Sequence, residues 1–80
     1  MTKEEQIMNT IGKNIRKYRL IFSATQTKLT QKDLAEKVGV STSLIGALES
    51  TKSQQGIGVY NLLKISEVLD VSIDKFFENW

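Results

Sequence analysis

The feature that most constrains this chain is a glycine followed, two residues later, by a strong helix-capping residue. Gly39 suits the left-handed position just past the end of a helix, because glycine adopts a positive φ without steric cost. Ser41 is a preferred N-cap, since its hydroxyl can accept a hydrogen bond from a backbone N–H of the following first turn. Two short helices must therefore meet through a tight turn. We expect them over residues 31–38 and 42–50.

Helical periodicity also covers the rest of the chain. From Ile7 to Phe22 an apolar residue recurs every three or four positions, which places one apolar stripe along a long helix. Gly12 interrupts this helix at an expected cost of about 1 kcal/mol relative to alanine. The polar segment Ser23–Lys28 is expected to be a loop or a frayed helix end. Two shorter apolar patterns follow, and the remaining helices are expected over about residues 4–22, 59–69 and 73–78.

The expected fold is all-α, with five helices in a single domain over residues 1–80. A chain of this length buries only a thin core, so its stability is expected to be modest. Phe76 and Phe77 are expected to pack in that core. We predict that two copies of the chain contact each other through the last helix, at Phe77, and through Trp80 beyond it.

Composition excludes most catalytic and metal chemistry. The chain contains no cysteine, histidine or proline, which excludes disulfides, thiolate or imidazole nucleophiles and zinc-finger ligands. Neighbouring acidic residues lie at helix starts or on solvated faces, and no nucleophile or base accompanies them. We therefore expect no enzymatic activity, no metal and no cofactor. The N-terminus lacks a signal-peptide pattern, and no apolar run is long enough for a membrane span, so a cytoplasmic protein is expected.

Charge is distributed unevenly along the chain. The net charge is only +2, yet residues 13–32 carry six cations and no acidic residue, while the remainder is mildly acidic. Such asymmetry indicates a polyanionic partner such as nucleic acid, although a solvated helix face often carries similar charges.

The expected helix over residues 42–50 has an unusual outer face. Ile45 and Leu48 point inward by their spacing, so small residues occupy the opposite side. Small side chains allow a helix backbone to approach another large object closely, and tight packing against a neighbouring helix is an equally compatible explanation. The outer residues are Thr42, Ser43, Gly46 and Ala47.

Residues 29–49, LTQKDLAEKVGVSTSLIGALE, resemble the helix-turn-helix of the lambda-repressor-like regulators, also called the Cro/C1-type or XRE family. The segment 69–77 is similar to the fifth-helix ending common in that family, and the resemblance covers about residues 11–77. It implies a five-helix lambda repressor-like DNA-binding domain. The second helix of the pair then enters the major groove of double-stranded DNA, and the first crosses the phosphate backbone.

The resemblance also implies roles for individual residues. Arg19 and Glu49 are expected to form an ion pair that locks the first helix onto the third, with any phosphate contact by Arg19 secondary. Thr42 departs from the longer polar residue of many relatives, and the loop between Glu49 and Tyr60 has two extra residues. The implied base-reading residues are Thr42, Ser43, Gly46 and Ala47. The implied contacts to the DNA backbone are Arg19, Lys28, Gln31, Lys32, Lys52 and Asn61, with Arg19 and Gln31 foremost.

The leading interpretation is a sequence-specific transcriptional regulator that binds double-stranded DNA. In this interpretation it is a small bacterial or phage-type repressor that binds a palindromic operator as a homodimer, without a small-molecule effector or a membrane. The alternative is a protein-interaction module of the same fold, such as an antitoxin or anti-repressor partner with weak DNA binding. This alternative stays open because residues 42–50 contain no lysine or arginine.

Overall fold

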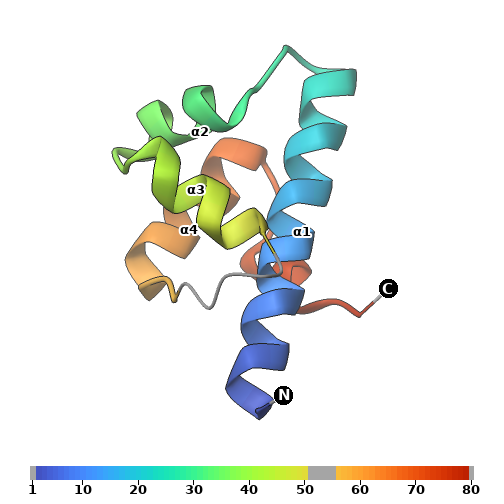
Figure 1. Cartoon of the computed structure of the whole chain (residues 1–80). Coiled ribbons are helices and arrows are strands. Elements are labelled where there is room, and N and C mark those ends of the chain that lie inside the picture. The colour runs from blue at the N-terminus through green and yellow to red at the C-terminus, as the bar shows by residue number, and fades with distance from the viewer. Residues whose placement is uncertain (1, 51–55, 80) are drawn as a thin grey trace.

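The computed structural model describes residues 2–50 and 56–79, all of whose regular elements are helical. One long helix stands beside three shorter ones, and its first turns extend beyond them (Figure 1). The predicted all-α class is confirmed. In chain order the elements are α1 (Lys3–Thr25), α2 (Gln31–Val38), α3 (Thr42–Glu49), α4 (Val59–Leu69) and a 3₁₀ helix, η1 (Ile73–Phe77).

The turn between α2 and α3 has the geometry that the sequence predicts. Gly39 adopts a left-handed conformation with φ of 87°, and its N–H donates to the carbonyl of Ala35 over 2.8 Å. Ser41 caps α3, because its hydroxyl accepts the backbone N–H of Leu44 at 3.1 Å. The two helices therefore meet across a short connection, which fixes α3 relative to α2.

Helix α1 is longer than the sequence predicts and ends at Thr25 rather than at Phe22. Ser23 explains part of this difference, since its hydroxyl accepts the N–H of Leu29 at 3.0 Å and so ties the helix end to the chain entering α2. Leu29 itself is buried. Ser23–Thr25 thus belongs to the helix, and only the residues after it form the loop.

Each of the five elements contributes at least one fully buried residue to the core. These residues are 0% exposed and lie in one cluster: Ile15, Leu34, Ile45, Ile65 and Phe76. The expectation that Phe77 also lies in the core is wrong, because its side chain is 50% exposed. Phe76 and Phe77 are adjacent in the 3₁₀ helix η1, so their side chains point about 120° apart, and only Phe76 faces the core.

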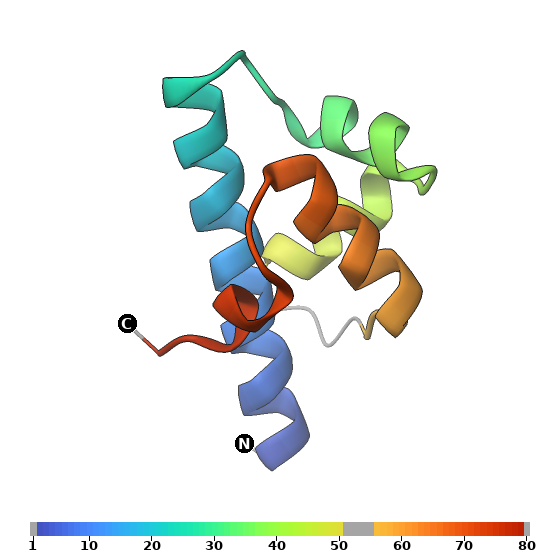
Figure 2. The same cartoon turned by 180° about the vertical axis from the view of Figure 1, so that it is seen from behind.

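The C-terminal segment is fastened to α1 by two side chains. Asn14 is completely buried, and its amide nitrogen donates to the carbonyls of Phe76 and Glu78, both at 2.8 Å. The hydroxyl of Tyr18 donates to the carboxylate of Glu78 at 2.6 Å. This hydrogen bond raises the pKa of Tyr18 and lowers the pKa of Glu78. Figure 2 shows η1 held against α1 on the side away from α3.

No helix among the described residues is both long enough and apolar enough to cross a membrane.

Candidate nucleic-acid interface

Helix α3 presents an open outer face over a buried inner one. Ile45 and Leu48 are buried, at 0% and 4% exposure. On the opposite side Thr42 and Ser43 are exposed, and Gly46 and Ala47 are half-buried. The residues predicted to read bases can therefore be reached from solvent. Because Thr42 and Ser43 are exposed, packing against a neighbouring helix does not account for these two small residues.

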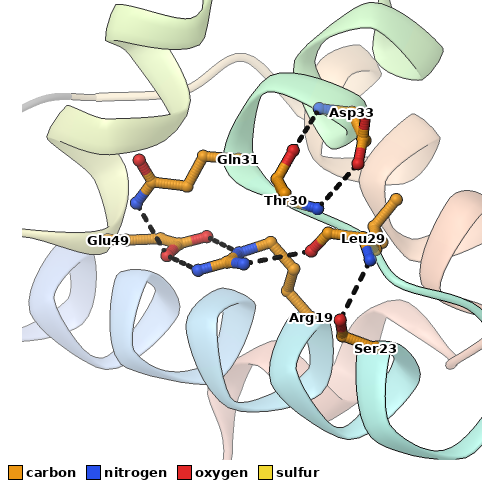
Figure 3. Close-up of polar contacts among 7 residues, drawn as sticks. All are labelled: Arg19, Ser23, Leu29, Thr30, Gln31, Asp33 and Glu49. Atoms are coloured by element: carbon orange, nitrogen blue, oxygen red, sulfur yellow. Dashed lines mark hydrogen bonds and ion pairs between the residues drawn. The ribbon is translucent and has the colours of Figure 1, made fainter.

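An ion pair joins the C-terminal end of α3 to α1, as the sequence analysis predicts (Figure 3). Arg19 Nε donates to Glu49 Oε2 at 2.7 Å, and Arg19 Nη2 donates to Glu49 Oε1 at 2.8 Å. The two side chains are 11% and 2% exposed. The hydrogen bond to Glu49 raises the pKa of Arg19, so the guanidinium stays charged. This bidentate pair holds α3 against α1 in one orientation.

The same geometry argues against Arg19 as a leading contact to the DNA backbone. Its third nitrogen, Nη1, donates to the carbonyl of Leu29 at 3.1 Å. All three guanidinium nitrogens are therefore directed at oxygens of the protein, in a side chain with little exposed surface.

Gln31 lies across from α2 to α3 rather than projecting away from the protein. Its Nε2 donates to Glu49 Oε1 at 3.1 Å (Figure 3). Its Oε1 is 3.5 Å from the position that a Cβ on Gly46 would occupy. Gln31 is half-buried and therefore accessible at the edge of the α3 outer face, but its amide nitrogen already has an acceptor in Glu49.

The start of α2 carries a capping box between two lysines. Thr30 and Asp33 form the predicted capping box: Thr30 Oγ1 accepts the N–H of Asp33, and the Asp33 carboxylate accepts the N–H of Thr30, both at 3.0 Å. The hydrogen bond from the Thr30 N–H lowers the pKa of Asp33. A helix start leaves further N–H groups without intrahelical partners. Lys28 and Lys32 are exposed on either side of this helix start.

The other predicted backbone contacts are dispersed. Asn61 is half-buried in the first turn of α4, a helix that packs against α1 and α2. Lys52 lies outside the described residues, as does Trp80 of the predicted dimer contact. Phe77 is described, and half of its side-chain surface is exposed.

Arg16 is an exposed cation on α1 to which the sequence pattern gave no role. It follows Gly12 by four residues, and at Gly12 the helix α1 touches the backbone of α3. Residues four apart share one side of a helix, so Arg16 lies on the side of α1 that carries Gly12. The four-residue spacing between Gly12 and Arg16 can be read from the sequence, but the contact between Gly12 and α3 cannot.

The described residues contain no group of three acidic side chains placed to hold a metal ion.

Comparison with known proteins identifies the class of the chain. A family model described as helix-turn-helix, of the Cro/C1 type, matches residues 15–76. The matched region includes α2, α3 and α4 entirely, together with the second half of α1. A search among curated proteins finds no match.

Proposed function

This chain belongs to the Cro/C1-type helix-turn-helix family of DNA-binding regulators, and on that premise we propose that it is a sequence-specific transcriptional repressor. In this proposal it binds a palindromic operator in double-stranded DNA as a homodimer in the cytoplasm. The observation that supports this proposal most is the open outer face of α3, a helix whose C-terminal end is held on α1 by the ion pair of Arg19 with Glu49. Helix α3 enters the major groove and α2 crosses the phosphate backbone.

The bases are read by short side chains. Thr42 and Ser43 lie in the first turn of α3, are exposed, and carry hydroxyls that donate and accept hydrogen bonds to base edges. Ala47 offers a methyl group for apolar contact with the methyl of thymine. Gly46, between them on the outer face, has no side chain to keep the helix away from the floor of the groove.

The phosphate contacts flank α3 on two sides. Lys28 and Lys32 lie at the start of α2, where the helix dipole also favours an anion. Arg16, rather than the paired Arg19, supplies the cation from α1. Asn61 makes a further contact from the first turn of α4, and Gln31 contributes from the edge of the outer face. These contacts fix the register of the protein, and the residues of α3 provide the specificity.

Two exposed apolar side chains near the two ends of the chain support the homodimer. Ile7 is 43% exposed and Phe77 is 50% exposed, and both border one hollow of about 240 Å³ between the start of α1 and the C-terminal segment. In this proposal a second copy covers this hollow, and the two α3 helices occupy half-sites about 34 Å apart, which is one turn of DNA. Repression then follows from occupation of the promoter and requires no catalytic group or effector.

Selection from a random pool of duplex oligonucleotides tests the function. We expect a palindromic consensus with half-sites one helical turn apart. For the selected duplex, the logarithm of the affinity should fall linearly with the logarithm of the salt concentration, by about 0.9 for each phosphate contact. Failure to enrich any sequence, or equal affinity for a scrambled duplex, would contradict the proposal and favour a protein-interaction module, such as an antitoxin, on the same fold.

A further inference from the structure

Gly12 is the point at which α1 and α3 meet through their backbones. A Cβ built on Gly12 would overlap the carbonyl oxygen of Leu48 and stand 3.0 Å from its carbonyl carbon. In glycine a hydrogen points in that direction, so the Leu48 oxygen rests against the Cα of Gly12, a contact typical of closely packed helices. Unlike the flexible end of a side chain, a backbone carbonyl cannot swing aside to make room. No residue other than glycine fits at position 12 while α3 keeps its place.

The contact lies at the same end of α3 as the ion pair. Leu48 touches Gly12, and the next residue, Glu49, is bound by Arg19. Gly12 and Arg19 are seven residues apart, which is about 10 Å along the axis of α1. The last turn of α3 is therefore attached to α1 at two points, which restrain how close this end of α3 lies to α1.

We propose that Gly12 is a positioning residue for DNA reading, an inference that rests on the proposed function. By leaving room for the Leu48 carbonyl, it sets how closely α3 lies on α1 and therefore the direction in which the outer face of α3 points. The sequence pattern alone marks Gly12 as a cost to helix stability. In the structure this glycine allows α3, the helix that carries Thr42 and Ser43, to lie directly against α1.

A small displacement at this point is large on the scale of base recognition. To accommodate a Cβ at position 12, the C-terminal end of α3 must move by on the order of 1 Å, because close-packed backbone atoms do not interpenetrate. The turn at Gly39 holds the other end of α3, so the shift tilts the helix. Hydrogen bonds to base edges span about 2.7–3.2 Å, so a tilt that moves a base-reading side chain by this amount removes its hydrogen bond. Flexible lysine side chains can still follow the phosphates. Specific binding should therefore suffer more than non-specific binding.

The test compares Gly12→Ala with Ile65→Val, a control that weakens the core from α4, which packs on α1 and α2. For each protein, the dissociation constants for the duplex selected by the unmodified chain and for a scrambled duplex are measured at one salt concentration, below the melting temperature. We expect Gly12→Ala to lower the ratio of specific to non-specific affinity at least about tenfold, the discrimination of one good base contact. Non-specific affinity and the salt slope should stay unchanged, and Ile65→Val should keep the full ratio.

A ratio for folded Gly12→Ala within twofold of the unmodified chain would overturn the inference and leave the proposed function intact. A ratio of one for the unmodified chain would instead refute the proposed function, and the inference with it. If Gly12→Ala does not fold, NMR of the unmodified chain on its selected duplex decides. Nuclear Overhauser contacts between the Gly12 α-hydrogens and Leu48 and Glu49 should persist in the complex, and their loss on DNA binding would overturn the inference.

Discussion

Replacing Glu49 by glutamine should destabilise the protein far more than the similar size of the two side chains suggests. Three N–H donors converge on the two carboxylate oxygens of Glu49, two from Arg19 and one from Gln31, at 2.7 to 3.1 Å. A glutamine has one oxygen and one NH₂ group at these positions. Its NH₂ must therefore face a donor, and the guanidinium of Arg19, only 11% exposed, loses its counter-ion.

The magnitude follows from these contacts. Loss of a hydrogen bond to a charged group costs about 1.5–3 kcal/mol, and removal of one partner from a fully buried ion pair costs about 3–5 kcal/mol. Arg19 keeps its bond to the Leu29 carbonyl and a little exposed surface, so the lower part of that second range applies. We expect Glu49→Gln to lower the free energy of unfolding by about 3 kcal/mol, which for a domain of this size lowers the melting temperature by more than about 10 °C.

Urea denaturation followed by circular dichroism measures this change. The matched control is Glu36→Gln on the exposed side of α2, which should change the free energy of unfolding by less than about 0.5 kcal/mol. The double variant Arg19→Met with Glu49→Leu removes both charges together and should recover at least half of the loss. The reasoning is refuted if Glu49→Gln behaves like the control, or if the double variant loses as much as the two single changes added together.

Four further predictions concern other parts of the fold. Asn14→Ala leaves two carbonyls of the C-terminal segment without their donor and should cost about 3 kcal/mol in calorimetric stability; a loss below about 1 kcal/mol would show that these bonds do not hold the segment. Gly39→Ala forces alanine into a φ of 87° and should cost about 1 kcal/mol in urea denaturation, whereas no change would mean that the turn tolerates a side chain. Because the Thr30 N–H lowers the pKa of Asp33, its carboxylate stabilises the fold above the pKa of the unfolded chain, and this stability is lost as the pH falls through the lower folded value. The melting temperatures of the unmodified chain and Asp33→Asn should therefore converge toward acid pH, and a constant difference would contradict this. Arg16→Gln should reduce the salt slope of DNA binding by about 0.9 without changing the melting temperature, and an unchanged slope would remove Arg16 from the interface.

Local chemistry explains why much of the fold could be predicted from the sequence. A capping residue and a left-handed glycine act over one turn of chain, so Thr30, Gly39 and Ser41 mark the ends of α2 and α3 without reference to the rest of the molecule. The inward direction of Ile45 and Leu48 follows from helical spacing alone. The pairing of Arg19 with Glu49 spans thirty residues, and it was predictable only through the resemblance to a known family.

Features that depend on tertiary contact were missed or misjudged. Gly12 resembles a weak point in a helix until α3 lies against it, and Asn14 resembles an ordinary polar residue until the C-terminal carbonyls reach it. Phe77 was expected in the core because it is a large apolar residue next to Phe76, yet only Phe76 is buried, and this depends on how η1 packs against α1. In each case the contact that decides the role of the residue is made with a residue far away in the chain. The spacing of residues along the sequence does not show such contacts.

Cross-saturation NMR on the complex with the selected duplex tests the central claim most directly. Saturation of the DNA resonances transfers to those protein amides that lie against the DNA. We expect strong transfer to Thr42, Ser43 and Ala47 on α3 and to the start of α2, with little at η1. Transfer concentrated on α4 or η1, with the outer face of α3 unaffected, would contradict DNA reading by α3.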